Sequence, residues 1–432
     1  MAAVLLPAIG AHAQMPEMPE VATNAQIVLK QISNQMSFTI SNPNKKALTD
    51  TPVCIAIPRG TTFKSATVLI NSKEIPSQMD DLNGDGVKDE LAFVVDIKKK
   101  GRLTVDVTFS REEAAADRYP ARVSAQMFFA DKDKSHKVKQ HIPTDTVSEV
   151  VDNMYNVMHH HGPAFESELV AYRVYFDKKQ TTDLYGKKVQ QLELADGLWY
   201  SSQKPELAAR KFGDDIIRVY QTVGVGTLRG WDESQDKNPM VMIDPFDWRQ
   251  AHVVAKGPVR TIVDMNVQGW QYKGRKLNLK SRYTLYAGQR ECEIIQQFEG
   301  NTEGLEFVTG VMKTGVVNKD SVEIASPLDM NDGAGLCASW GKDWPDGNRK
   351  FYPIMQTSGL AVSVPSAHVL RLIDVKDQLL YGIKTDSRNA ICYKMSFCAP
   401  DHETFVKKWT PKRWFKHVKE WKAVQPVKVE IK

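Results

Sequence analysis

The sequence predicts a protein dominated by β-structure, with a small N-terminal β-sandwich, large stacked antiparallel sheets and one C-terminal helix. Three observations favour this fold class. Short β-branched segments bounded by turn residues fill the first part of the chain, longer strand-like segments follow, and aromatic residues recur at helical spacing near the end. The 432 residues are enough for two or three domains with sizeable cores.

The first block, residues 20–145, has the composition of a small β-sandwich. Its strand-like segments are Thr67–Ile70, Leu91–Val95 and Leu103–Val107. A short stretch rich in Glu and Ala, residues 111–116, predicts a brief helix within this block.

The second block, residues 146–432, carries the longer strands. We expect them at Glu168–Phe176, Asp215–Val225, His252–Tyr272 and Leu277–Phe298, with a hairpin turn at Gly269–Gly274. Near the end, Trp414, Phe415, Val418 and Trp421 recur at helical spacing, which predicts an amphipathic helix packed on a sheet.

The first residues combine a short apolar run with the small-residue site Ala11-His12-Ala13. We expect residues 1–13 to be a signal peptide cleaved before Gln14, and the mature protein to be periplasmic. The positively charged segment that normally precedes such a run is missing, which indicates a truncated start, and a buried N-terminal strand is the alternative. No other apolar run approaches the roughly 20 residues of a membrane-spanning helix.

Composition narrows the classes of ligand and of cysteine chemistry that suit this protein. The net charge of +5 comes from scattered basic residues with one denser C-terminal cluster, Lys407–Lys422, which we interpret as a solvated helix face rather than a nucleic-acid site. A mildly basic protein suits an acidic polysaccharide. The five cysteines show no zinc-binding spacing and their number is odd, so disulfide pairing stays open and no thiol chemistry is assigned.

The run from Asp81 to Glu90 has the pattern of a calcium loop. Oxygen-bearing residues alternate along it and glycines stand where the chain must turn sharply, as a hard cation of this size requires. The expected ligands are the side chains of Asp81, Asn83, Asp85 and Asp89 and the carbonyl of Val87. We expect a structural Ca²⁺ here; a polar turn without metal is the alternative.

The densest group of ionisable residues lies between His159 and Lys187. If the stretch from Glu166 is one alternating strand, Glu166 and Tyr172 share one face and Arg173 and Tyr175 share the other. Histidine exchanges protons near neutral pH, and arginine pairs with a carboxylate through two hydrogen bonds. The candidate catalytic residues are His159, His160, His161, Glu166, Arg173, Tyr175, Tyr185 and Lys187, with Asp183 as a substrate-binding residue. The alternative is a hydrogen-bonded loop that orders a domain junction.

Two further segments suit sugar binding. Trp231 and Asp232 follow a glycine-rich run that lacks the third glycine and the helix of a dinucleotide loop. Trp248 and Arg249 form a similar set. Exposed tryptophans here would stack on sugar rings while their polar neighbours bind hydroxyl groups.

These motifs resemble a family of exported bacterial proteins that carries a domain-of-unknown-function label. The resemblance rests on His159–Lys187, on the Gln78–Glu90 loop and on Lys256–Arg260, and it covers nearly the whole mature chain. Members commonly accompany genes for the use of uronic-acid polysaccharides, including pectin lyases and unsaturated-uronyl hydrolases. The resemblance implies a galactose-mutarotase-like β-supersandwich for the second block and assigns no catalytic residues.

Two hypotheses follow. The first is an enzyme that acts on uronate-containing glycans. As a lyase it would use Arg173 to neutralise the carboxylate, one of the histidines to abstract the proton at C5, and Tyr175 or Tyr185 to protonate the leaving oxygen. As an epimerase or mutarotase it would use Glu166 or Glu168 as the base and His160 as the acid. The second hypothesis is a non-catalytic glycan-binding protein that uses Trp231 and Trp248.

Overall fold

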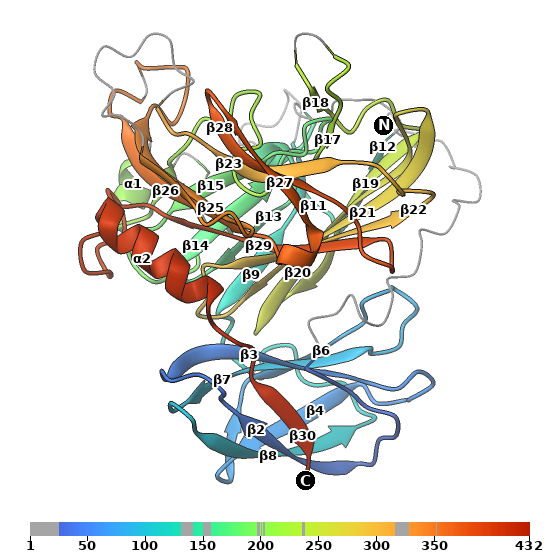
Figure 1. Ribbon diagram of the computed structural model, residues 1–432. Helices are drawn as coiled ribbons and strands as arrows, with labels where there is room; N and C mark the ends of the chain where they lie inside the picture. Colours follow the sequence, from blue (N-terminus) through green and yellow to red (C-terminus); the bar gives the residue numbers. More distant parts are fainter. Residues whose placement is uncertain are drawn as a thin grey trace, which may run out of the picture.

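The computed structural model describes residues 26–130, 141–149, 157–196, 199, 201, 204–235, 238–315, 328–350 and 352–432. The predicted signal peptide and its cleavage site lie outside the described residues. The all-β fold with a C-terminal helix is confirmed (Figure 1). In the part of the chain that the structure describes, no helix is long and apolar enough to cross a membrane.

Two sheets near the N-terminus pack face to face and form the lower half of the molecule in Figure 1. Alternation along β8 buries Val105, Val107 and Phe109 against Phe38 and Phe93, which gives the sandwich its own apolar core. One sheet has the order β1 (Ile27–Val28), β3 (Leu48–Ala56), β7 (Glu90–Ile97), β6 (Ser77–Asp80), and the other the order β30 (Lys428–Ile431), β2 (Gln35–Ser41), β8 (Arg102–Ser110), β4 (Ser65–Ile70), β5 (Lys73–Ile75).

The predicted helix at residues 111–116 is wrong. The stretch forms bends and irregular chain, and each of its six residues is exposed. An isolated turn of helix is unstable in water unless an apolar face packs on something, and this stretch packs none.

The upper half is a larger sandwich built around one extensive core. A nine-stranded sheet has the order β12 (Thr146–Glu149), β19 (Trp248–Lys256), β20 (Arg260–Tyr272), β21 (Arg275–Tyr286), β22 (Cys292–Glu299), β29 (Ala390–Cys398), β26 (Gln356–Ser363), β25 (Leu336–Asp343), β24 (Leu328–Asn331) in the described residues. Two five-stranded sheets contribute to the same core: β16 (Asp214–Asp215), β15 (Thr182–Gly186), β14 (Val170–Val174), β13 (Ala164–Ser167), β9 (Val123–Gln126), and β18 (Met240–Val241), β17 (Arg229–Trp231), β23 (Phe307–Met312), β28 (Gln378–Ile383), β27 (Val369–Val375).

The predicted hairpin is confirmed, and two of the predicted strands differ in the structure. In the hairpin, Tyr272 pairs with Arg275, and Lys273 and Gly274 both have positive φ, as a two-residue hairpin turn requires. The strand predicted from 252 to 272 is two strands, because residues 257–259, which include Pro258, form the turn between β19 and β20. Of the predicted strand at 215–225, Asp215 pairs as part of β16 and Val225 forms an isolated antiparallel bridge with Val311, while the residues between them form turns and irregular chain.

The C-terminal helix α2 (Pro411–Lys422) forms as predicted. Thr410 caps its first turn by accepting a hydrogen bond from the Arg413 amide, and Trp414 and Val418 are fully buried. The helix lies across β25 and β26 at the left of Figure 1, so its aromatic stripe belongs to a core.

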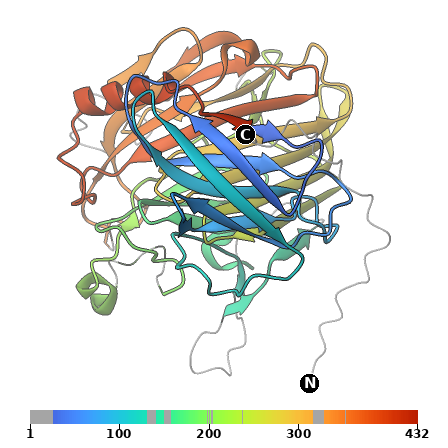
Figure 2. The ribbon, with the colours of Figure 1, turned by 90° about the horizontal axis from the view of Figure 1, so that it is seen from below.

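Strand pairing crosses the predicted boundary at residue 145 in both directions. β9 joins the sheet of β13, whereas the last strand, β30, returns to pair with β2 in the N-terminal sandwich. Figure 2 shows this sandwich from below, lying across the sheets of the larger one.

Ion pairs join the two halves, one group of them buried around Arg260 and the other partly exposed around Arg122. Arg260 of β20 contacts Asp80 and Glu90, and Arg122 contacts both Asp50 and Glu168. Glu168 therefore lies at the junction, and this candidate base is engaged in a structural ion pair.

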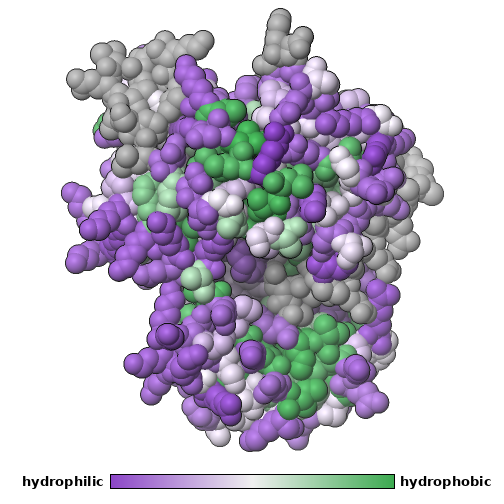
Figure 3. All heavy atoms as spheres, viewed as in Figure 1, coloured by the Kyte–Doolittle hydropathy of each residue, from purple (hydrophilic) through white to green (hydrophobic). Residues whose placement is uncertain are grey.

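Figure 3 shows a mainly hydrophilic surface on this face, with hydrophobic patches over both halves. All five cysteines lie in described segments as free thiols.

Candidate functional site

The segment from Glu166 to Phe176 is a hairpin rather than the single strand predicted. β13 turns at Glu168 and Leu169 into β14, so Glu166 pairs with Ala171 and Phe165 with Tyr172. Residues paired across antiparallel strands point to the same side of the sheet. The prediction that Glu166 and Tyr172 share a face is therefore wrong, and Glu166 lies on the same side as Arg173.

The five-stranded sheet that contains this hairpin has two different buried faces. Phe165, Tyr172 and Leu184 point into the main core. The opposite face carries ionisable groups in register, because Arg173 pairs with Asp183 and Tyr185 pairs with Asp215. The chain after β15 folds back over this polar face, which gathers most of the predicted site residues in one place.

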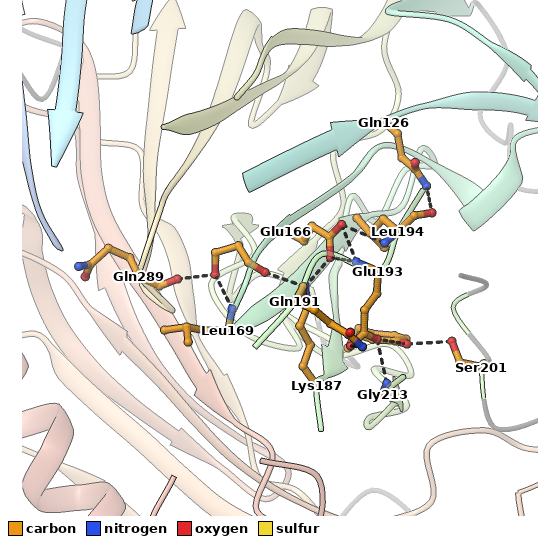
Figure 4. A network of polar contacts seen from close by, with 12 residues as sticks. Gln126, Glu166, Leu169, Lys187, Gln191, Glu193, Leu194, Ser201, Gly213 and Gln289 are labelled. Carbon is orange, nitrogen blue, oxygen red and sulfur yellow. Dashed lines mark hydrogen bonds and ion pairs between the residues drawn. The ribbon is translucent and has the colours of Figure 1, made fainter. Parts of the chain in front are cut away.

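Glu166 and Lys187 form a completely buried ion pair on this face (Figure 4). The Lys187 ammonium also donates to the carbonyls of Ser167 and Gln191, both at 2.7 Å. The Glu166 carboxylate accepts the backbone N–H groups of Glu193 and Leu194. With 0 % of either side chain exposed, the pair ties the returning chain to the sheet and lies away from solvent.

Tyr185 extends the same network. Its hydroxyl donates to Glu193 at 2.7 Å and lies 2.8 Å from the Ser201 hydroxyl. Burial, followed by the charge of Glu193, raises the pKa of the phenol far above its usual range. This Tyr185 holds its proton at any physiological pH and acts here as a fixed hydrogen-bond donor.

The three histidines form a short 3-10 turn, His159–His161, in which His160 takes a left-handed backbone conformation. The His160 ring lies 3.7 Å from that of His159 and 5.9 Å from that of Trp199. Burial lowers its pKa well below the usual range, and the charges of His159 and Arg173 act in the same direction. His160 is therefore a neutral, buried imidazole beside Gln126 and Trp199 on the polar face.

Arg173 stands at the centre of a second cluster on this face. Its guanidinium contacts one Asp183 oxygen at 2.5 Å, donates to the Tyr175 hydroxyl at 3.0 Å, and lies 3.6 Å from Asp215. The Tyr175 hydroxyl donates to the same Asp183 oxygen at 2.7 Å. The Trp199 ring lies against the guanidinium, at 4.5 Å from its centroid.

The two carboxyl groups of this cluster are not equivalent. Asp183 takes the short contacts from Arg173 and Tyr175, whereas one Asp215 oxygen accepts the Ile217 amide at 3.1 Å and the other keeps the longer contact to Arg173. Burial raises the pKa of Asp215 well above its usual range, and the negative charge of Asp183 raises it further, while Arg173 opposes the shift. Two carboxyls that share one cation in a buried site favour a proton on one of them, and that one is Asp215.

Asp215 and Tyr175 open onto a cavity of about 500 Å³, within the usual range of small-molecule sites. We call it the upper cavity. Lys179 and Arg218 bring two cationic side chains to its wall, and Asp346 brings a second carboxyl from the loop after β25. The Arg218 guanidinium lies over the ring of Tyr220, at 4.6 Å. The rest of the lining is Ile217, Val219, Tyr220, Gln221, Pro345 and Gly347.

Of the segment His159–Lys187, Tyr175 and Lys179 line the upper cavity, while Arg173 and Asp183 support Tyr175 from behind. Sequence reasoning missed Asp215, Arg218 and Asp346. One signal was available: the acidic doublet Asp214-Asp215 stands between Gly213 and two isoleucines, an unusual place for two charges.

The aromatic sugar-binding prediction is wrong in its premise of exposure. Trp231 is 5 % exposed and Trp248 is 7 % exposed, and the Trp231 indole donates to Glu233. Arg249 is buried over the ring of Phe246, and only Asp232 of this set reaches the surface. Trp231 and Asp232 belong to or follow β17, in a different sheet from the Arg173 cluster.

The Asp81–Asp89 loop connects β6 to β7 at the junction. Asp81 accepts the amides of Gly84 and Gly86, Asn83 that of Asp85, and Asp85 that of Val87. Burial raises the pKa of Asp89, and the nearby charges of Asp81 and Asp85 add to the shift. The donor chemistry suits Ca²⁺. Among the described residues, however, no three His, Cys, Asp or Glu side chains are grouped as metal ligands, so calcium remains a prediction.

The chain was compared with known families and structures. The model of the family described as "Domain of unknown function (DUF4861)" matches residues 40–431. The chain belongs to this family. A search of curated proteins returns no match.

Three solved structures match the chain at low identity. A glycosyl hydrolase family 38 protein from Enterococcus faecalis is 8% identical over 93% of this chain and 48% of its own, with a TM-score of 0.47. An alpha-mannosidase from Enterococcus faecalis V583 is 9% identical over 93% and 46%, with a TM-score of 0.44. A putative aldose 1-epimerase from Klebsiella pneumoniae subsp. pneumoniae MGH 78578 is 9% identical over 69% and 95%, with a TM-score of 0.32. The chain spans about half the length of the first two, and none of the three assigns a residue or a reaction to it.

Proposed function

We propose that the protein is a carbohydrate-active enzyme that cleaves uronate-containing glycans by β-elimination in the upper cavity. One observation carries the proposal. The cavity wall combines Lys179 and Arg218 with Asp215, a buried carboxyl whose environment favours its protonated form. Cations, an acid and a second carboxyl facing one space are the groups that this reaction requires.

The cations would act on the substrate's carboxylate. Removing the proton at C5 of a uronate places negative charge on the carboxyl group, and a cation beside that group stabilises the charge as it develops. Arg218 and Lys179 line the cavity and would lie beside this carboxyl group. A neutral sugar offers nothing for them to stabilise, so the two side chains favour a uronate, such as the galacturonate of pectin-type polysaccharides.

The two carboxyls would move the protons. Asp346 takes the proton from C5, the electron pair of that bond forms the C4–C5 double bond, and the C4–O bond breaks. The departing oxygen takes the proton of Asp215. Asp346 is then protonated and Asp215 ionised, and proton exchange with water restores both groups without an added reactant.

The predicted catalytic tyrosines and histidines receive other roles. Burial raises the pKa of Tyr175 well above its usual range, so the phenol keeps its proton, is a poor acid for the leaving oxygen, and serves to hold Asp183. His160 is buried and is absent from the cavity lining. Arg173 contacts Tyr175, Asp183 and Asp215 and is a positioning residue.

The proposal includes a setting in the cell. A protein that acts on uronate polysaccharide needs access to it, which supports export to the periplasm through residues 1–13. Ca²⁺ in the Asp81–Asp89 loop would stabilise the junction and take no part in the reaction.

The test is incubation of the protein with a panel of uronate oligosaccharides and their neutral counterparts, followed by ultraviolet absorbance and NMR. The proposal expects an absorbing unsaturated uronate end from uronates alone. New configurations without absorbance would indicate an epimerase or mutarotase instead. Binding shifts without any product would favour the non-catalytic glycan-binding protein, and equal cleavage of neutral oligosaccharides would contradict the uronate assignment.

A further inference from the structure

A second cavity lies where the N-terminal sandwich meets the larger one. We call it the junction cavity; its volume is about 190 Å³ and it shares no lining residue with the upper cavity. Its wall combines β4 and β6 with residues 113–119 of the N-terminal block and with the Gly257-Pro258 turn between β19 and β20. Both halves of the molecule therefore contribute to it.

Hydrogen bonds hold the floor of the junction cavity. Gln78, which is buried, accepts the backbone N–H groups of Val259 and Arg260 and donates to the Arg260 carbonyl. The Ser65 and Ser77 hydroxyls donate to backbone carbonyls. A floor fixed by these bonds needs little rearrangement to receive a ligand, which lowers the entropic cost of binding.

The charges around the junction cavity favour an anion. Lys64, Lys88 and Arg118 line it, against one carboxylate, Glu113. Lys64 pairs with Glu113 at 3.7 Å, and Arg118 pairs with Glu74. Lys88, the one lysine of the predicted calcium loop, makes no ion pair with any residue that the structure describes.

The remaining wall suits a sugar ring. Ala66, Met79 and Pro258 provide apolar surface, and Tyr119 adds an aromatic ring whose hydroxyl is held by Glu74 at 2.7 Å. A pyranose has C–H groups that pack on such surfaces and hydroxyls that remain hydrated. A compact anion such as phosphate would use the lysines and leave the apolar wall without a partner.

We propose that the junction cavity is a second anionic-sugar site, which holds one uronate unit of a glycan chain with Lys88 as its principal cation. The inference takes its substrate class from the proposed function, and it assigns a binding role to the N-terminal half. A chain held at the junction would remain attached to the enzyme between cleavage events in the upper cavity.

The experiment measures binding of a uronate disaccharide to the full chain by titration calorimetry and NMR, with Asp215→Asn present throughout to prevent turnover. The expected result is two sites. Lys88→Gln should weaken one of them about tenfold or more, as loss of a charge-assisted contact does. Ala115→Trp, which fills the cavity from an exposed position, should remove the same site, and Lys73→Gln, an exposed lysine of β5, is the matched control.

The possible results separate clearly. If Lys88→Gln and Ala115→Trp both leave the two affinities unchanged in folded protein, the inference is overturned. Inorganic phosphate that binds the site as tightly as the disaccharide would also overturn it, because the sugar ring would then contribute nothing. A disaccharide site that responds to Lys88 in a protein without lyase activity would support this inference while refuting the proposed reaction.

Discussion

Two buried arginines in this molecule each face two acidic side chains, and the two clusters differ in how they share the charge. At the junction, Arg260 contacts Asp80 at 2.7 Å and also pairs directly with Glu90. Beside the upper cavity, Arg173 contacts Asp183 at 2.5 Å but Asp215 only at 3.6 Å. The first cluster gives each carboxylate its own guanidinium nitrogen, and the second leaves one carboxyl without such a contact.

The comparison shows how one set of residue types serves two purposes. A buried carboxylate with a close cation is stable as an ion and fixes structure. A buried carboxyl whose neighbouring cation is bound more closely by another carboxylate holds its proton more tightly. A ligand in an adjacent cavity can then accept that proton. We therefore interpret the Arg260 cluster as a clamp and the Arg173 cluster as a source of acid.

The largest expected effect is the loss of turnover in Asp215→Asn. The amide keeps the shape of a protonated carboxyl but cannot give up a proton, so cleavage of uronate oligosaccharide should fall about 100- to 10,000-fold. The initial rate of ultraviolet absorbance measures this, with substrate affinity measured alongside. A variant that retains more than a tenth of the activity would remove Asp215 from the reaction.

The Asp215→Asn variant should also change how the free energy of unfolding depends on pH. Because the folded state raises the pKa of Asp215 above its unfolded value, the folded protein binds more protons in the window above that unfolded value. The contribution of Asp215 to the free energy of unfolding therefore falls as pH rises through this window. Asp215→Asn should remove this part of the slope, and chemical denaturation at a series of pH values checks it. An unchanged slope would mean that the pKa of Asp215 is not raised.

The second effect is structural. Arg260→Met removes the cation from Asp80 and Glu90 and leaves two buried carboxylates uncompensated, at a cost of about 3–5 kcal/mol in the free energy of unfolding. Adding Glu90→Gln should restore part of that loss. Denaturant titration gives both values, and turnover per folded molecule should stay unchanged, since Arg260 is not in the lining of the upper cavity.

The third effect tests the calcium loop, which connects the two acidic partners of the clamp: Asp80 ends β6 and Glu90 begins β7. Ca²⁺ at 100 times its dissociation constant should stabilise the protein by about 2.7 kcal/mol. Thermal melts in calcium and in chelator measure this, with Asp85→Ala as the variant that should lose the difference. Identical melting temperatures in the two buffers would exclude the site.

Those parts of the fold that local sequence determines were predictable. Lys273-Gly274 permits the tight hairpin of β20 and β21, and the aromatic spacing from Trp414 predicted α2. The pairing of β30 with β2 was not predictable, because the chain separates them by nearly its whole length. Helix formation at residues 111–116 failed because composition does not show whether a stretch will find a packing surface.

The candidate site also has one part that the sequence could predict and another that it could not. Arg173, Tyr175 and Asp183 are close in sequence, so their density was visible. Asp215 and Asp346 reach the upper cavity from distant segments, and only the folded chain brings them together. The exposure of Trp231 and Trp248 was misjudged because a tryptophan beside glycine and aspartate can be either core or surface.

The smallest expected effect concerns Arg218 in the wall of the upper cavity. It distinguishes the effect of a charge near the cavity from that of a charge elsewhere on the surface. Arg218 stacks on Tyr220 at 4.6 Å and lines the upper cavity, whereas Arg210 stacks on Phe212 at 4.4 Å and does not. Both arginines are exposed, so solvent and salt weaken their attraction for an anion. Arg218→Ala should raise KM for a uronate oligosaccharide about tenfold, by roughly 1.4 kcal/mol of binding, and the effect should shrink as salt is added. Arg210→Ala removes the same charge and a similar stacking contact, and it should leave KM unchanged. Steady-state kinetics at two salt concentrations compare the pair; equal changes in both variants would show that general surface charge, and not the cavity, attracts the substrate.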